Sequence, residues 1–75
     1  TKYKKSLINK KLFVLFENKV SGKEEFFGRD EFSNSVIVKS NENLVGKIEE
    51  ISIMDGNQNT LFGIRQNENK KEFAA

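Results

Sequence analysis

The sequence has 75 residues and contains neither cysteine nor histidine. Without cysteine the chain cannot form a disulfide, present a thiolate nucleophile or bind an iron–sulfur cluster. Without histidine it lacks an ordinary zinc ligand and the base of a Ser–His or Cys–His catalytic pair. The absence of cysteine fits a reducing compartment, so we expect a cytoplasmic protein.

Long hydrophobic runs and cofactor motifs are missing as well. The longest apolar run, Leu12–Phe16, is far shorter than the roughly 20 residues needed to span a bilayer, and no signal-peptide pattern is present. Neither a phosphate-binding glycine loop nor a calcium-loop motif occurs. Adjacent carboxylates at Glu24-Glu25 and Glu49-Glu50 would point to opposite faces of a strand. We therefore expect no catalytic residue, metal site or cofactor in this chain, and no membrane contact.

Positive charge is concentrated in the first third of the chain. Residues 1–23 carry seven Lys and one Glu, a net charge of +6, whereas residues 24–75 carry six basic and ten acidic residues, a net charge of −4. Such a distribution can attract a polyanion to one side of a protein and repel it from another. Nucleic acid is a candidate partner on this ground, and a solvated basic arm without any partner is the alternative.

Short apolar runs alternate with Gly, Asn, Ser and Asp clusters, which is typical of an all-β sandwich or barrel. No window keeps the apolar spacing of a helix, although residues 41–45 are compatible with one helical turn. The sequence predicts a single domain with its core over residues 7–65 and loose polar ends at 1–6 and 66–75. The predicted strands cover residues 11–18, 23–30, 35–40, 47–54 and 60–64. We predict that they form a small closed five-stranded antiparallel β-barrel, with an isolated curled sheet as the alternative.

Local patterns add detail to the predicted strands. The run LFVLF at 12–16 is apolar on both faces, as expected where a sheet is covered on both sides or closes on itself. Val36 and Val38 share the core-facing side of the third strand, and Ile51 and Ile53 point inward from the fourth. Ile48 breaks that alternation, so a bulge or a curl is expected at the start of the fourth strand. The sequence Asp55-Gly56-Asn57 predicts a turn after it.

Four glycines are assigned structural roles in this arrangement. Gly22 supplies a positive φ in the hairpin after the first strand. Gly28 indicates either a bulge or a close backbone approach inside the second strand, and Gly63 lies inside the last one in the same way. Gly46 ends the loop before the fourth strand.

Cationic, amide and aromatic side chains near the strand ends are the candidate binding groups. Arg29 can pair with phosphate or stack on a base, Phe32 can stack on an unpaired base, and Asn34 can contact a base edge. The alternatives are that Phe32 caps the barrel end, that Arg29 pairs with Asp30 or a Glu, and that Asn34 forms a turn. The remaining candidates are lysines: Lys10, Lys11, Lys39 and Lys47.

The order of four segments resembles a known family. They are similar to the TRAM domain that ends the tRNA methylthiotransferases, which make 2-methylthio-isopentenyladenosine. The four segments are KSLINKKLFVLFENK, FFGRDEF, VIVKSNENLVGKIEEISI and NTLFG. The resemblance covers about residues 5–64. It implies an OB-like barrel that grips the tRNA anticodon stem-loop, while a radical S-adenosylmethionine domain with two 4Fe-4S clusters performs the chemistry. It also implies a monomeric C-terminal piece of a longer enzyme, with no DNA partner.

Three parts of this sequence match motifs of the family at corresponding positions. They are Gly28-Arg29, Gly46-Lys47 and residues 61–63. Asp30 replaces a threonine of the family, and we expect it to orient Arg29 rather than touch RNA. Glu49 replaces a valine, and an inward Glu there needs a cationic partner or access to solvent.

Two alternatives to RNA binding remain open. A sister family modifies a ribosomal protein, and the acidic second part of this chain would suit such a basic partner. A domain that only docks on the catalytic domain is the third possibility, and exposure of Phe13 or Leu15 would favour it.

Overall fold

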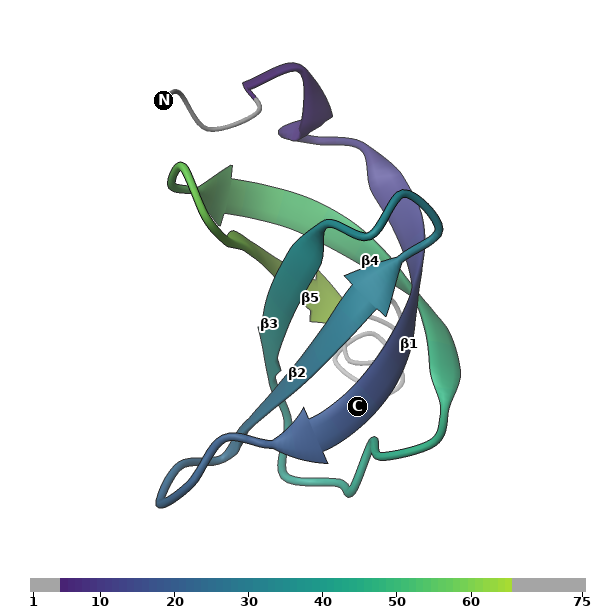
Figure 1. Cartoon of the computed structure of the whole chain (residues 1–75), viewed down its shortest axis with the longest axis vertical. Coiled ribbons are helices and arrows are strands. Elements are labelled where there is room, and N and C mark those ends of the chain that lie inside the picture. Colours follow the sequence, from purple (N-terminus) through teal and green to yellow (C-terminus); the bar gives the residue numbers. More distant parts are fainter. Residues whose placement is uncertain (1–4, 66–75) are drawn as a thin grey trace, which may run out of the picture.

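The computed structural model of the protein describes residues 5–65, which form five strands after a short 3-10 helix (Figure 1). The elements are η1 (Lys5–Leu7), β1 (Lys11–Lys19), β2 (Glu25–Asp30), β3 (Ser35–Lys39), β4 (Ile48–Gly56) and β5 (Leu61–Arg65). Of the predicted loose ends at 1–6 and 66–75, residues 1–4 and 66–75 lie outside the described residues, whereas Lys5 and Ser6 belong to η1 and are not a loose end. The helical turn considered for residues 41–45 is not formed, because that segment is an irregular connection.

All five predicted strands exist, with ends shifted by one or two residues. β2 starts at Glu25, two residues late, because Val20 N–H bonds to Glu25 O (2.8 Å) and closes the hairpin there. β4 extends through Asp55 and Gly56, so the turn that was predicted at 55–57 begins at Asn57. Asn57 N–H donates to Thr60 O (2.8 Å), and β5 accordingly runs from Leu61 to Arg65.

The strands close into a barrel in the order β1-β2-β3-β5-β4, with β4 paired back to β1. Every neighbouring pair is antiparallel except β3 and β5, which are parallel. The prediction of a closed barrel is confirmed, and the prediction that it is entirely antiparallel is wrong. The physical reason is parity, because strand directions cannot alternate all the way around a closed ring with an odd number of strands.

The core is the inward face of all five strands. Val36 and Val38 point inward as predicted, as do Ile51 and Ile53, while Leu44 enters from the connection between β3 and β4. The buried hydrophobic residues are Val14, Phe16, Phe26, Val36, Val38, Leu44, Ile51, Ile53 and Leu61. Closure covers only this inner face, so the apolar residues on the outer face of β1 stay at the surface.

Gly28 marks a close backbone approach and not a bulge. A Cβ at this position would lie 2.5 Å from Leu15 O and 2.9 Å from Phe16 Cα. The bulge lies opposite, in β1, where the register shifts between Phe16 and Asn18 and leaves Glu17 as the extra residue. The predicted positive φ at Gly22 is confirmed at 75°.

The start of β4 is regular, which corrects a second expectation. The apolar Ile48 seemed at odds with inward Ile51 and Ile53, and a bulge or curl was expected there. Instead Ile48 faces Leu15 in an unbroken ladder and points outward, and the register shift of β4 falls later, between Ile53 and Asp55.

Candidate functional site

Three large apolar side chains form an exposed patch on the outside of β1 and β4. Phe13 is 59% exposed, Leu15 46% and Ile48 66%. Leu15 is the cross-strand neighbour of Ile48 on one side and of Arg29 on the other. We call Phe13, Leu15 and Ile48 the β1 patch; together with Arg29 and Glu17 it lines a shallow surface hollow.

Arg29 stands at the edge of the β1 patch, with 53% of its side chain exposed. Its Nε lies 3.7 Å from an oxygen of Glu17, and its guanidinium carbon lies 5.7 Å from the centroid of the Phe27 ring. An exposed ion pair of this length is worth little, and the guanidinium also lies over the face of the Phe27 ring, which attracts a cation. The alternative in which Arg29 pairs with a Glu is therefore confirmed, yet the group stays accessible to a ligand.

Asp30 does not orient Arg29, which corrects the role assigned to it. Its side chain is buried and turns into the following loop, where Oδ1 accepts Phe32 N–H (2.9 Å) and Asn34 N–H (2.8 Å). Its Oδ2 accepts the side-chain amide of Asn34 (2.8 Å). The neighbour of Arg29 is Glu17 instead. Asp30 thus fixes the loop of residues 31–34, as a buried carboxylate must find donors.

The fixed loop decides between the alternatives for its two candidate residues. Phe32 is 69% exposed, so it projects from the loop and does not cap the barrel. Asn34 is a turn former, because its backbone and side-chain amides both bond to Asp30.

The candidate lysines lie in different places. Lys11 begins β1 on the same outer face as Phe13, and Lys10 precedes it, its carbonyl accepting Ile53 N–H (2.9 Å). Lys47 directly precedes Ile48. Ile48 and Arg29 pair with Leu15 from opposite sides of β1, so Lys47 lies across β1 from Arg29. These three cations border the β1 patch or the barrel end next to it.

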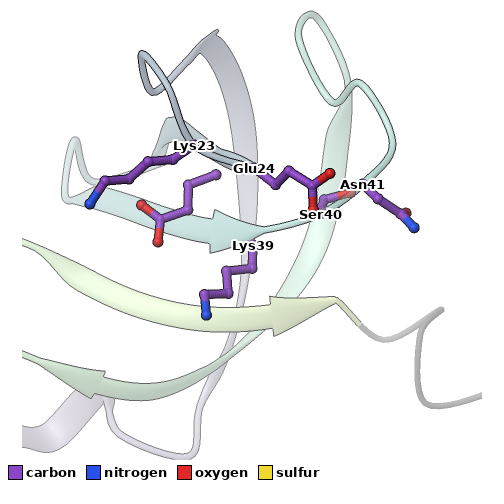
Figure 2. Close-up of a pocket in the computed structure, with 6 residues that line it drawn as sticks. Lys23, Glu24, Lys39, Ser40 and Asn41 are labelled. Carbon is purple, nitrogen blue, oxygen red and sulfur yellow. The ribbon is translucent and has the colours of Figure 1, made fainter.

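Lys39 is separated from the other candidates. It ends β3 opposite Glu25, while Arg29 faces Ser35 at the other end of the same ladder. That places Lys39 about 13 Å farther along the strands. There it borders a hollow with Lys23, Glu24 and Asn41 (Figure 2).

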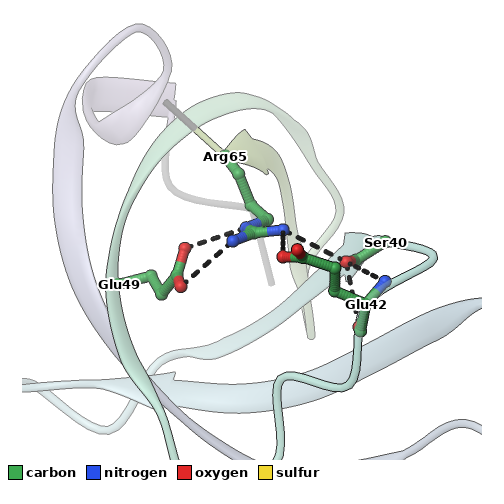
Figure 3. A network of polar contacts seen from close by, with 4 residues as sticks. All are labelled: Ser40, Glu42, Glu49 and Arg65. Atoms are coloured by element: carbon green, nitrogen blue, oxygen red, sulfur yellow. Dashed lines mark hydrogen bonds and ion pairs between the residues drawn. The ribbon is translucent and has the colours of Figure 1, made fainter. Parts of the chain in front are cut away.

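Of the two possibilities expected for Glu49, a cationic partner or access to solvent, the structure shows the cationic partner, and it is Arg65, which was not among the candidate residues. Arg65 Nε donates to Glu49 Oε1 (2.8 Å) and Nη2 to Oε2 (3.2 Å), while Nη1 donates to Glu42 (2.7 Å) and to Ser40 Oγ (3.4 Å) (Figure 3). The bonds to Glu49, more than those to Glu42, raise the pKa of the buried Arg65 guanidinium although burial opposes them. This cluster ties β5 to β4 and to the β3–β4 connection.

Residues 5–65 offer neither a cluster of metal-binding side chains nor a membrane-spanning helix. No group of three or more acidic, histidine or cysteine side chains is placed to hold a metal ion within that range. The same part of the chain has no helix that is long and apolar enough to cross a membrane.

Fold and surface together define a small β-barrel domain with a fixed aromatic loop, an exposed arginine and an exposed apolar patch. A scan against known protein families finds no matching family. Over 73 residues the chain is 44% identical to the tRNA-2-methylthio-N(6)-dimethylallyladenosine synthase of Pelagibacter ubique (strain HTCC1062). The match covers 97% of this chain and 16% of that protein. The predicted resemblance to the C-terminal region of a tRNA methylthiotransferase is therefore confirmed, and the small barrel fits a TRAM domain.

Proposed function

We propose that this chain is the TRAM domain of a tRNA methylthiotransferase and that it holds the anticodon stem-loop of tRNA. The observation that carries the proposal is the 44% identity to the synthase across almost the whole chain. The closed five-stranded barrel supports an OB-like interpretation. The 4Fe-4S clusters and S-adenosylmethionine of such an enzyme would be bound by a separate radical domain, because this chain has no cysteine. The protein would act in the cytoplasm.

The proposed RNA surface combines Arg29, Phe32 and the lysines around them. Phe32 offers a ring to an unpaired base, and Arg29 offers a planar cation to a phosphate or a base. Lys10, Lys11 and Lys47 supply further charge nearby. Lys39 is left out of this surface because it lies at the far end of the barrel beside Glu25. Glu17 partly neutralises Arg29, so we expect the domain alone to bind weakly.

An NMR titration of the 75-residue chain with a synthetic anticodon stem-loop tests the proposal. We expect shifts at Arg29, Phe32 and Lys47. Replacing Arg29 with Ala should weaken binding and reduce the slope of log affinity against log salt by about 0.7–0.9, because one fewer phosphate is neutralised. Shifts that avoid all three residues would contradict the proposed surface.

A second function is favoured by the β1 patch. Exposed apolar side chains that lie together mark contact surfaces, and Phe13, Leu15 and Ile48 are 46–66% exposed. The patch could dock the barrel on the rest of its own polypeptide, or on a basic ribosomal protein. Capture of partners from a cell extract, with and without RNase, separates the two functions. A partner retained after RNase and lost in Leu15→Lys would assign the patch to protein.

A further inference from the structure

A third hollow lies at the end of the barrel that carries the β2–β3 loop. It is lined by residues 33–35 on one side and 57–61 on the other, and none of these residues is charged. Its walls are the loop after β2 and the turn before β5. These segments are more than 20 positions apart in sequence, yet they lie side by side here.

The parallel pairing of β3 and β5 creates this hollow. Val36 pairs with Leu61 in the same direction, so the two segments that lead into these strands must reach the same end of the barrel together. In an antiparallel pair the two lead-in segments would lie at opposite ends. The hollow thus follows from the one ladder that the sequence did not predict.

Both walls are held in place before any ligand arrives. The loop of residues 31–34 is fixed by the hydrogen bonds to Asp30. The turn is fixed by Asn57, whose Oδ1 accepts Asn59 N–H (2.9 Å) and Thr60 N–H (2.8 Å). A ligand that binds between rigid walls does not have to order them, so little affinity is lost to loop entropy.

Two side-chain amides remain available on the turn. Gln58 and Asn59 are exposed, and no hydrogen bond within residues 5–65 engages their side chains. An amide carries both a donor and an acceptor, and this combination matches the edge of a nucleobase. A phosphate would find no cation in this hollow.

We propose that the hollow binds the edge of an unpaired nucleobase, with Gln58 and Asn59 as the hydrogen-bonding residues. The inference rests on the proposed RNA-binding function and extends it from Arg29 and Phe32 to a second segment of the chain. Phe32 projects from the loop that forms one wall, so a base stacked on its ring and a base in the hollow would be near neighbours along one single strand.

The test uses the 75-residue chain and a fluorescent anticodon stem-loop at several salt concentrations. Gln58→Ala and Asn59→Ala, singly and together, are compared with Asn41→Ala, an exposed amide beside the hollow at the opposite end. We expect the double variant to bind about tenfold more weakly and Asn41→Ala to bind like the unchanged chain. The salt slope of the double variant should stay constant, because amide contacts to bases release no counterions.

A hairpin whose loop nucleotides lack bases provides the second arm. The double variant and the unchanged chain should bind it equally, and a persistent difference would overturn the assignment to a base. A lower salt slope in the double variant would overturn it too, since that result indicates a phosphate contact.

Failure of the inference is distinguishable from failure of the proposed function. If Arg29→Ala and Phe32→Ala weaken binding while the double variant binds normally, the hollow is not a base site and the RNA-binding function stands. If the unchanged chain binds no stem-loop, or ignores Arg29 and Phe32, the RNA-binding function fails as well. Side-chain amide shifts of Gln58 and Asn59 with a protein partner alone would reassign the hollow to protein.

Discussion

Gly28 is a residue at which two strands approach each other closely. An added methyl group would lie 2.5 Å from Leu15 O, 2.7 Å from a Val14 methyl and 2.9 Å from Phe16 Cα, and two of these three are backbone atoms. We expect Gly28→Ala to destabilise the barrel by about 2–3 kcal/mol, because the ladder between β1 and β2 must shift. Urea unfolding followed by circular dichroism measures the change.

Gly22→Ala is the matched control for this prediction. Gly22 has φ 75° and open space around it, so alanine there costs only the strained torsion, about 1 kcal/mol. A loss at Gly28 no larger than the loss at Gly22 would show that the close approach is not a constraint.

Arg65 is the buried cation of the molecule's main polar cluster. Arg65→Met should cost about 2–4 kcal/mol, because it leaves Glu49, which is only 17% exposed, without its counter-charge. Adding Glu49→Val should recover part of the loss, since the second change removes the stranded carboxylate. Thermal and urea unfolding of the single and double variants give the coupling energy.

Arg29→Met serves as the control for Arg65→Met. The Arg29–Glu17 pair is long and exposed, so we expect its loss to cost less than about 1 kcal/mol. Equal losses at both arginines, or no recovery in the double variant, would contradict the assigned role of the cluster.

The local sequence pattern was enough to predict the structural roles of some of these residues. A glycine inside an apolar strand predicted either a bulge or a close approach at Gly28, and an acidic residue at an inward position predicted either a counter-charge or access to solvent for Glu49. The identity of that charge could not be predicted, because Arg65 is 16 positions away and meets Glu49 only through the β4–β5 register. Arg65 is also the residue by which β5 extends beyond its predicted end.

At the scale of elements, the loop between β2 and β3 depends on one carboxylate. Asp30→Ala removes the acceptor of three hydrogen bonds and should cost about 1–3 kcal/mol. It should also raise the nanosecond mobility of residues 31–34, which 15N relaxation detects. Because Phe32 would lose its fixed position, RNA binding should weaken even though Asp30 contacts no ligand.

Asp55→Ala is the corresponding control, since Asp55 is exposed and the one hydrogen bond of its side chain in the described structure is accepted from the adjacent Gly56 N–H (2.8 Å). We expect a loss of at most about 0.5 kcal/mol there. An unchanged order parameter across 31–34 in Asp30→Ala would show that the loop is held by other contacts.

Strand positions were predictable because inward and outward residues alternate with a period of two. The pairing of β3 with β5 could not be predicted in this way. The two strands are neighbours in the barrel, but the chain passes through the whole of β4 between them. Parity alone requires at least one parallel pair in a closed barrel of five strands, so the error lay in combining closure with complete antiparallel order. Apolar residues on both faces of β1 predicted that the sheet closes into a barrel. The barrel buries only the inner face of β1, so Phe13 and Leu15 remain exposed on its outer surface.

At the scale of the whole molecule, the barrel distributes its lysines between two ends. Lys10 and Lys11 lie at the start of β1, near the end that carries Phe32, whereas Lys23 and Lys39 lie at the opposite end beside Glu24 and Glu25. These two groups of lysines could not be separated from the sequence alone, because net charge along the chain does not reveal strand direction. Of these two pairs, the proposed RNA surface uses the first, Lys10 and Lys11, together with Lys47.

A pairwise exchange of lysines tests this polarity. Lys10→Gln/Lys11→Gln should lower the slope of log affinity against log salt by about 1.5, because two phosphate contacts with single-stranded RNA are lost. Lys23→Gln/Lys39→Gln changes the net charge by the same amount at the other end, so it controls for the general attraction between protein and RNA. It should leave the slope within about 0.3 of the unchanged chain. Equal slopes for the two variants would mean that the stem-loop lies along the barrel and not at one end, and the RNA surface would then have to include Lys39.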